Sequence, residues 1–452
     1  MSGAPVVVLG AGCAGLAAAR RLREKGIPTV LIEAEDRVGG LAGGIRLGRD
    51  VYEYGPHIFH TTDARVMADV KALMGAELIP YKRTISIKFL GGYFKFPLSI
   101  PDVLMKLPLT TVVHAGASFA YHFTKGLLVR PARENSETVL RRYYGDVLYR
   151  IFFKDYIERV WGVSPADFSP SFARERIPRF SILAALDRFS PKTAGYVEKV
   201  EGELWTTKHG FSLICERMAE DFVKKGGELR LSTRASKLSR EGGRVVAVDV
   251  ERGGETRRLA CAGVVNTLAI TDAARMFSPA LDADALDAAS RLRFRAVVFV
   301  GLKIRKPRAL RASFMYFREH SFNRITDFAH FGFELDPGTT LLLAEIACDE
   351  KDAFWRDEAA AVAAVVSDLV REKIVERGEI SETHVFRARH AYPMYTLGYE
   401  RALETLLGAF GALENVETAG RQGRFQYVNT HIAMRMGFDA ADALERKLAS
   451  AR

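Results

Sequence analysis

Residues 5–33 constrain the fold of this chain more than any other segment, because strand, glycine turn, helix and acid follow one another at fixed spacing. Residues 5–10 read PVVVLG, which is typical of a buried parallel strand. The motif GAGCAG then spans residues 10–15 and leads into a stretch rich in Ala, Leu and Arg. A second strand is expected at residues 28–32 and ends at Glu33. This order is that of a dinucleotide-binding βαβ unit.

The glycines and the acid of that unit each have a physical role in this sequence. Gly10 allows the tight turn, Gly12 leaves room for a pyrophosphate, and Gly15 lets the helix approach the strand. The free N–H groups at the helix N-terminus then face the pyrophosphate. Glu33 is placed to accept hydrogen bonds from ribose hydroxyls, and an acid at this position argues against a 2′-phosphate. The motif alone leaves NAD and FAD open.

A second glycine-rich segment follows the ribose acid. Gly39 and Gly40 allow another close backbone approach, and Arg37 lies beside them as a candidate partner for a pyrophosphate. A flexible surface loop is the alternative interpretation.

Charge and cysteine content narrow the class of partner. Lys and Arg exceed Asp and Glu to give a formal net charge of +10 over 452 residues. Such an excess favours acidic small molecules or an anionic surface without requiring nucleic acid. The four cysteines are far apart and form no CxxC pair, which predicts reduced thiols, a cytoplasmic protein and no zinc site.

The longest apolar stretch runs from Leu107 to Val129, and His114, His122 and Lys125 interrupt it. A spanning helix needs about 20 apolar residues with few charges, so crossing a membrane is disfavoured. A buried helix and a helix that lies against a membrane surface both remain open, and the sequence predicts no signal peptide at residues 1–5.

The remaining pattern predicts an α/β protein with a Rossmann-like dinucleotide domain, an inserted helical subdomain and an antiparallel-sheet substrate domain. Strands expected near residues 262–266 and 416–420 return the chain to the first domain. The predicted dinucleotide domain is therefore discontinuous and comprises residues 1–80, 200–280 and 410–452. The predicted substrate domain comprises residues 81–199 and 281–409, with the helical insertion at about 100–162.

Residues 55–61 read GPHIFHT and place His57 and His60 three positions apart. Two histidines at this spacing suit metal ligation on a helix, but Gly-Pro disfavours a regular helix here and no carboxylate cluster completes the site. The sequence therefore predicts no metal centre at these histidines.

The DRVGG segment at residues 36–40 resembles the glutathione-reductase-related flavoproteins, a group that includes amine oxidases, protoporphyrinogen oxidase, phytoene desaturases and UDP-galactopyranose mutase. In those families the segment binds FAD, so the resemblance implies FAD rather than NAD. The GPHIFHT segment is similar to that of UDP-galactopyranose mutases, whose second histidine lies near the flavin. The resemblance implies that His60 neighbours the flavin here.

Trp161 and the arginines that follow it are similar to the region of the mutases that lines the nucleotide-sugar site. The resemblance implies that Trp161 and Arg176 bind substrate, although the spacing leaves the choice between Arg176 and Arg179 open. A core tryptophan and a solvated arginine face are the alternatives.

Three further segments carry the same resemblance. Arg324 stands in a stretch similar to the TRI-x-[ED] motif of the mutases, and Tyr392 stands in a similar YP segment. Gly420, Arg421 and Tyr427 match the GRxGxxxY segment, whose arginine and tyrosine contact the diphosphate while the neighbouring backbone holds the flavin. The resemblance implies that Arg324 and Arg421 offset the charge of a departing diphosphate and that Tyr392 and Tyr427 orient it.

Three functions remain open from the sequence. The first is the interconversion of pyranose and furanose forms of a nucleotide sugar through reduced FAD, as in the mutases. The second is an FAD-dependent oxidase or dehydrogenase acting on an apolar substrate, since residues 428–431 lack the acid that the mutases carry there. The third is a flavin-binding partner protein without catalysis. The sequence does not indicate an oligomeric state.

Overall fold

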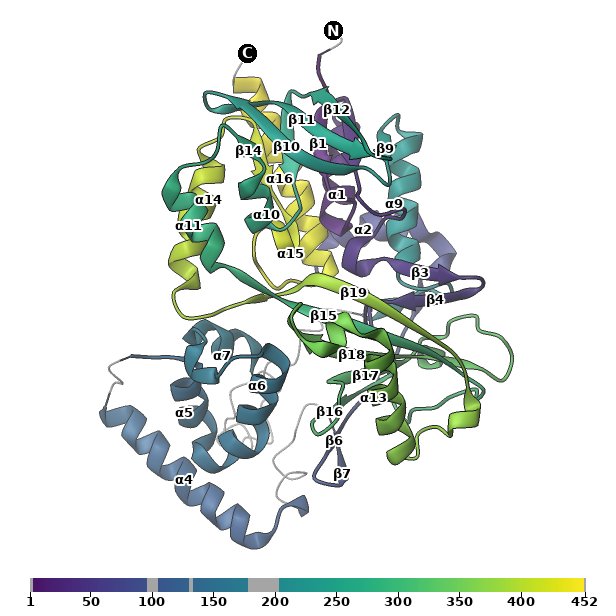
Figure 1. The fold of residues 1–452 in the computed structure, drawn as a ribbon, viewed down its shortest axis with the longest axis vertical. Helices are drawn as coiled ribbons and strands as arrows, with labels where there is room; N and C mark the ends of the chain where they lie inside the picture. The colour runs from purple at the N-terminus through teal and green to yellow at the C-terminus, as the bar shows by residue number, and fades with distance from the viewer. Residues whose placement is uncertain (1–2, 96–104, 130–132, 178–202, 451–452) are drawn as a thin grey trace.

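The computed structural model describes residues 3–95, 105–129, 133–177 and 203–450. Three larger β-sheets form the framework of this part of the chain (Figure 1). The N-terminal sheet is wholly parallel and has five strands, which come from distant parts of the sequence. In spatial order these strands are β20 (Val416–Thr418), β13 (Gly263–Asn266), β1 (Val6–Leu9), β2 (Thr29–Ile32) and β9 (Glu228–Arg230). The strands predicted near residues 262–266 and 416–420 are therefore confirmed.

Successive residues of β1 point to opposite faces of this sheet, as strand geometry requires. Val6 and Val8 pack against a helical layer, whereas Val7 and Leu9 pack against a second sheet. The helical layer contains α1 (Cys13–Glu24), α2 (Ala64–Met74), α9 (Ser212–Lys224) and α16 (Thr430–Ser450). The second sheet contains β12 (Glu255–Ala260), β11 (Arg244–Arg252), β10 (Arg234–Glu241) and β14 (Phe277–Ser278). The result is three layers with the parallel sheet, apolar on both faces, in the middle.

Around the same core lie α10 (Ile270–Arg275), α11 (Ala283–Arg291), α14 (Tyr399–Gly411) and the short α15 (Gly420–Gly423). Two small two-stranded sheets complete this half of the molecule, β3 (Gly44–Leu47) with β4 (Asp50–Glu53), and β5 (Ile79–Pro80) with β8 (Trp205–Thr206). Single 3₁₀ turns occur at Gly40–Ala42 and Gly75–Glu77.

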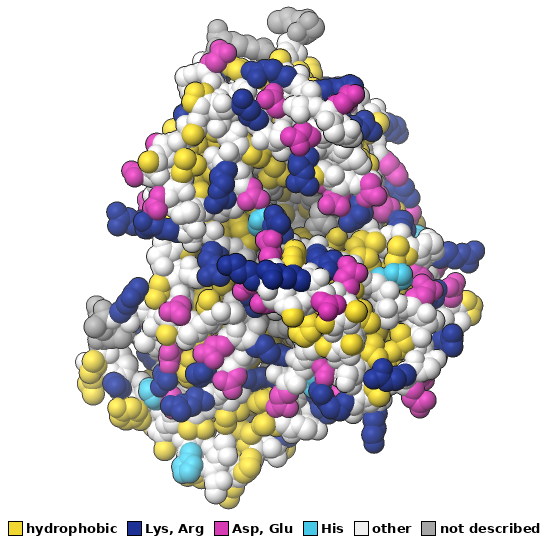
Figure 2. All heavy atoms as spheres, viewed as in Figure 1, with side chains coloured by type: hydrophobic (Ala, Val, Ile, Leu, Met, Phe, Trp, Pro, Cys, Tyr) yellow, Lys and Arg dark blue, Asp and Glu magenta, His cyan; other side chains and the backbone are white. Residues whose placement is uncertain are grey.

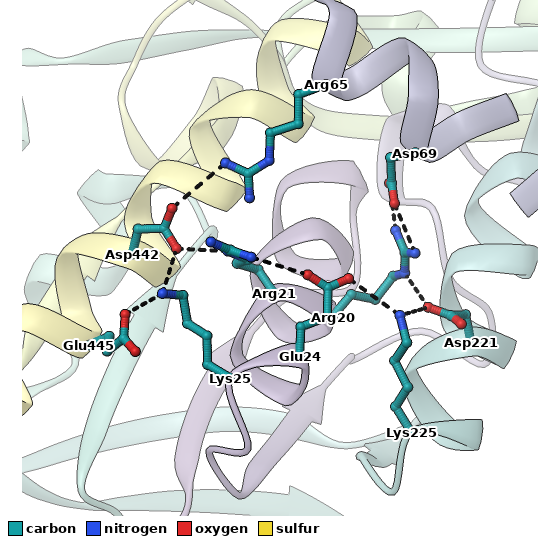
Figure 3. Close-up of polar contacts among 10 residues, drawn as sticks. All are labelled: Arg20, Arg21, Glu24, Lys25, Arg65, Asp69, Asp221, Lys225, Asp442 and Glu445. Carbon is teal, nitrogen blue, oxygen red and sulfur yellow. Dashed lines mark hydrogen bonds and ion pairs between the residues drawn. The ribbon is translucent and has the colours of Figure 1, made fainter. Parts of the chain in front are cut away.

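Ion pairs from α1 hold the helical layer together (Figure 3). Arg20 is only 3% exposed, and its guanidinium lies 2.6 Å from an oxygen of Asp69 on α2 and 2.8 Å from one of Asp221 on α9. Arg21 lies 2.8 Å from an oxygen of Asp442 on α16. Because Arg20 is buried and paired with two carboxylates, its charge is compensated where water is excluded. The four helices are thereby fixed relative to the glycine turn at the start of α1.

The second half of the molecule contains a seven-stranded sheet that is antiparallel except for one parallel pair, β16 with β6. In spatial order its strands are β19 (Ile380–Met394), β15 (Arg293–Ile304), β18 (Thr340–Cys348), β17 (Arg324–Asp327), β16 (Phe314–Phe317), β6 (Ile85–Phe89) and β7 (Gly92–Lys95). One face packs against α13 (Glu358–Arg371) and the short α12 (Ala353–Arg356). The opposite face carries Phe299 and Phe314, which turn toward the parallel sheet's half of the molecule. Short 3₁₀ turns lie at Phe328–Phe331 and Arg377–Glu379.

The predicted helical subdomain is present and lies at the lower left of Figure 1. It consists of α4 (Leu109–Leu128), α5 (Ser136–Tyr149), a π-helical turn at Arg150–Lys154, α6 (Asp155–Trp161), a 3₁₀ turn at Pro165–Asp167 and α7 (Pro170–Arg176). None of the helices in the described ranges combines the length and apolarity that a membrane crossing would require. The α/β fold class predicted above is therefore confirmed, whereas the exact domain boundaries stay a prediction.

Candidate functional site

A cavity of about 420 Å³ lies where the carboxyl ends of the parallel strands meet the seven-stranded sheet. Ligands of open α/β sheets bind beyond the carboxyl ends of the strands, so the position agrees with that rule. Most of the predicted site residues line this cavity. They are Gly10, Gly12, Glu33, Arg37, Gly39, Gly40, His60, Arg324, Tyr392, Gly420, Arg421 and Tyr427.

The glycine turn at the start of α1 has the geometry that its sequence predicts. Gly10 has a φ of +94°, a conformation that favours glycine. Gly15 does not line the cavity, because it packs against Gly10, and a Cβ there would lie 1.9 Å from the Gly10 carbonyl oxygen. Gly12 opens onto the cavity with no close neighbour, the nearest atom to a Cβ being the Gly39 oxygen at 3.9 Å. The turn therefore leaves a cradle next to the N-terminus of α1.

Glu33 lies at the carboxyl end of β2, where two backbone amides fix its side chain. Its carboxylate accepts hydrogen bonds from the amide of Ala11 at 2.8 Å and from that of Glu35 at 3.0 Å. Arg37 donates to the hydroxyl of Tyr54 at 3.1 Å. An acid and a guanidinium beside a glycine turn suit the ribose and pyrophosphate of a dinucleotide. The residues present therefore fit the adenosine ribose and the pyrophosphate of FAD.

Both histidines of the GPHIFHT segment line the cavity, and neither stands on a helix. Burial, with the positive charges of Arg421 and Arg324, lowers the pKa of His57 to about 3. His57 is therefore a neutral imidazole at physiological pH. His60 is 6% exposed, and its Nε2 lies 3.4 Å from the side-chain nitrogen of Asn429. Within the described ranges, no three His, Cys, Asp or Glu side chains converge to hold a metal ion.

Arg324 projects from the start of β17 into the cavity and forms a two-pronged ion pair with Glu345 of β18. The two N–O distances are 2.6 Å and 2.8 Å. Burial opposes the charge of Arg324, but the Glu345 carboxylate raises its pKa well above the usual range, so the guanidinium stays charged. Glu345 is buried, the Arg324 side chain is 18% exposed, and Gly55 lies against the Nη2 atom. This geometry holds the guanidinium in one orientation toward the cavity.

Two other guanidiniums lie against the ring of Tyr427. The central carbon of Arg176 lies 3.2 Å from the ring centroid and that of Arg421 lies 4.3 Å from it. Arg421 donates to the carbonyl oxygens of Val428 at 2.8 Å and Ala391 at 3.3 Å. No salt bridge joins Arg421 or Arg176 to a carboxylate within the described ranges, although the carboxylate of Glu175 interacts electrostatically with Arg176.

Tyr392 extends this aromatic cluster. Its ring stacks on that of Tyr427 with centroids 5.4 Å apart, and Trp161 lies 5.8 Å away on another side. Burial raises the pKa of Tyr392 far above its usual value, so its hydroxyl keeps its proton. The hydroxyl can therefore donate a hydrogen bond to an anion.

Two of the predicted substrate-binding residues do not line the cavity. Trp161 is 8% exposed and packs edge-on against Phe168 and Phe172, as the core alternative expects, although it also touches Tyr392. Arg176 reaches the site only through the ring of Tyr427. Arg179 lies outside the described residues.

Arginine is the commonest charged residue of the cavity wall. Six arginines and two glutamates line it, and the guanidiniums offer several groups that could bind an anionic ligand. Three of these arginines, Arg324, Arg387 and Arg389, also form ion pairs with glutamates that are not in the lining. The arginines are Arg37, Arg83, Arg324, Arg387, Arg389 and Arg421, and the acids are Glu33 and Glu35. Apolar side chains, among them Phe299 and Phe314 from the seven-stranded sheet, form the rest of one wall.

Sequence reasoning missed three residues that shape this site. His57 was considered only as a metal ligand, although the motif that marked His60 contains it. Glu345 has no motif of its own, and its place opposite Arg324 follows from the pairing of β17 with β18. Glu53 carries no sequence signal, because its burial depends on the distant loop at Phe211 and Ser212, whose backbone faces it.

Comparison with known proteins agrees with this geometry. Residues 8–73 match the NAD(P)-binding Rossmann-like domain family. Residues 159–442, more than half of the chain, match the flavin containing amine oxidoreductase family.

Similar curated proteins include two sugar-nucleotide mutases. A probable UDP-galactopyranose mutase from Klebsiella pneumoniae is 28% identical over 184 residues, which are 40% of this chain and 47% of that protein. A dTDP-fucopyranose mutase from Escherichia coli is 26% identical over 176 residues, 38% of this chain and 45% of that protein. The matched regions thus span less than half the length of these two relatives.

Solved structures extend the likeness over the whole fold. A reduced UDP-galactopyranose mutase superposes with a TM-score of 0.81 at 18% identity, covering 99% of this chain and 98% of that one. A putative protoporphyrinogen oxidase from Exiguobacterium sp. 255-15 gives 0.74 at 18% identity, covering 99% and 100%. At such identity these structures show the shared fold. The family match over residues 159–442 places this chain in the flavin containing amine oxidoreductase family, as an FAD-dependent enzyme.

Proposed function

We propose that the enzyme interconverts the pyranose and furanose forms of a nucleotide sugar. The observation that carries this proposal is the convergence of Arg324, Arg421 and Tyr392 on one cavity. Two guanidiniums beside a hydroxyl donor suit a diphosphate, because arginine binds phosphate oxygens with a planar, permanently charged fork.

The proposed role of each residue follows from its position in the cavity. FAD, when bound and reduced, would supply electron density to the sugar's anomeric carbon. As the bond between that carbon and the diphosphate breaks, negative charge accumulates on the departing oxygens. Arg421 and Arg324 offset this charge, and such electrostatic stabilisation commonly contributes most to catalysis. Tyr392, which keeps its proton, donates to the diphosphate and holds it for its return.

The remaining parts of the proposal are a cytoplasmic location and a small-molecule partner. The four cysteines are free and buried, which accords with the reducing compartment predicted from their spacing. The similarity to two sugar-nucleotide mutases supports a nucleotide sugar as the substrate class.

The test uses the purified holoprotein reduced with dithionite. We expect UDP to raise its melting temperature and to perturb the reduced flavin spectrum, and we expect one of a panel of UDP- and dTDP-sugars to yield a furanose product on chromatography. Arg421→Ala should abolish all three responses. Arg401→Ala, an exposed arginine on α14, is the matched control and should leave them unchanged.

A second candidate function is an oxidase or dehydrogenase of an apolar substrate. The family match and the apolar wall at Phe299 and Phe314 favour it. This function predicts an enzyme that ignores nucleotides and whose oxidised flavin is bleached by an amine, a porphyrinogen or a polyene. Such a result would replace the mutase proposal.

A further inference from the structure

The outer face of α4 gathers most of the large apolar side chains that the protein exposes. Seven of the ten exposed large hydrophobic side chains among the described residues lie between positions 105 and 129. The most exposed are Leu128 at 85%, Leu109 at 78% and Met105 at 77%. The others are Val113, Tyr121, Phe123 and Val129. Figure 2 shows hydrophobic side chains along this lower-left edge, over α4.

The exposure follows from how α4 packs. Its inner face meets α5, where Ala115 is buried and the Ser118 hydroxyl accepts a hydrogen bond from the amide of Asp146 at 2.7 Å. Gly145 allows this approach, because a Cβ there would lie 2.6 Å from the backbone nitrogen of Phe119. Residues three or four positions apart share a helix face, so Leu109, Val113, Tyr121 and Leu128 form an outer stripe. We call the exposed side chains of residues 105–129 the α4 face.

The charged side chains of the α4 face are all basic. Residues 105–129 contain no Asp or Glu, whereas Lys106 and Lys125 are basic and two histidines stand between them. The neighbouring acidic side chains, on α5 and in the segment before it, form ion pairs with arginines. Glu134 pairs with Arg142 and Arg174, Glu137 with Arg141, and Asp146 with Arg141 and Arg150. An approaching surface therefore meets apolar side chains bordered by positive charge.

This combination suits an anionic bilayer better than a second copy of the chain. A second copy would bring the same cations together and would offer no acid from its own α4 face. A bilayer with anionic headgroups accepts the leucines and the aromatic rings at its acyl boundary and attracts lysine at the headgroup level. Since α4 does not qualify as a crossing helix, it would lie in the plane of the interface.

We propose that the α4 face is a peripheral membrane-binding surface for bilayers that contain anionic phospholipid. The proposal is independent of the reaction, because none of the residues from 105 to 129 lines the cavity.

Co-sedimentation of the purified holoprotein with vesicles tests the proposal. We compare vesicles of phosphatidylcholine with vesicles of phosphatidylcholine and phosphatidylglycerol, at low and at high salt. The expected result is at least tenfold stronger binding to the anionic vesicles, weakened by salt as charge screening requires. The double variant Leu109→Ser with Leu128→Ser should lose at least tenfold in binding, and Lys125→Glu should weaken it at low salt.

The exposed Val223 on α9 provides the matched control, and Val223→Ser should bind vesicles as the wild type does. Retention of the flavin spectrum and melting temperature in each variant shows that the fold is intact. Absence of binding to any vesicle, or equal binding by the double variant, would overturn the proposal. A dimer in size-exclusion chromatography that the double variant dissociates would also overturn it, in favour of contact between two copies.

Discussion

The Oε2 atom of Glu53 lies 3.9 Å from the Nδ1 atom of His57, and neither atom has a hydrogen-bond partner among the described residues. Glu53 ends β4 with its side chain fully buried, whereas the ring of His57 reaches the cavity. The other oxygen of Glu53 accepts a hydrogen bond from the amide of Ser212 at 3.1 Å. The carboxyl group thus stands directly behind a residue of the site.

The first prediction concerns the pH dependence of stability. Burial raises the pKa of Glu53 to about 8, although the amides of Ser212 and Phe211 and the charge of Arg46 oppose the shift and Glu216 adds to it. The folded protein therefore holds a proton that the unfolded chain releases above its ordinary pKa of about 4.3. Stability from this group is complete at low pH and is lost as pH rises toward 8.

Glu53→Gln should remove this dependence, since glutamine does not titrate in this range. We expect the stability of the variant, relative to the wild type, to rise by about 1.4 kcal/mol per pH unit between pH 5 and pH 7.5. Thermal unfolding of the holoprotein at several pH values measures the change. Parallel pH profiles for wild type and variant would contradict the assignment.

The second prediction concerns the buried pair of Arg324 and Glu345. Glu345→Leu should destabilise the protein by about 1–3 kcal/mol, because it leaves a largely buried guanidinium, 18% exposed, without its counter-charge. The double variant Arg324→Met with Glu345→Leu should recover part of that loss, since no buried charge remains. Thermal unfolding of the two variants measures these stabilities. A double variant less stable than the single variant would contradict the view that the unpaired charge of Arg324 causes the loss.

The third prediction tests the ring between two guanidiniums. Tyr427→Ala should weaken UDP binding to the reduced enzyme about tenfold, because Arg176 and Arg421 lose the ring against which both guanidiniums pack. Tyr427→Phe keeps the ring and should bind within about threefold of the wild type. Calorimetric titration with UDP gives both values. Equal losses in the two variants would assign the effect to the hydroxyl instead.

How far the sequence predicts this site depends on the distance over which each contact is made. The segment from Gly10 to Glu33 is continuous in sequence, so its geometry follows from its own residues. Both Gly10 and Glu33 line the cavity. Arg324, Tyr392 and Arg421 were marked by short motifs, and the fold brings them to one cavity. Their roles in binding and catalysis stay predictions.

Contacts between distant segments escaped prediction for a physical reason. Arg176 reaches Tyr427 only because α7 packs beside the chain that follows α15, and no local pattern encodes that packing. The apolar stretch of residues 107–129 likewise predicts a helix, but its sequence does not indicate which helix face packs against the rest of the protein. Its partner α5 covers one face and leaves the other exposed.

The last prediction tests the glycine turn on which FAD binding depends. A Cβ at Gly15 would lie 1.9 Å from the carbonyl oxygen of Gly10, far closer than any real contact, so Gly15→Ala must push α1 away from β1. The cradle beside the N-terminus of α1 then opens, and the protein should purify without its yellow colour. Gly408→Ala is the control, because Gly408 lies in α14 with open space around its Cβ position. The absorbance ratio of flavin to protein, together with far-ultraviolet circular dichroism, separates loss of FAD from loss of fold, and a Gly15→Ala protein that keeps its flavin would refute this account of the turn.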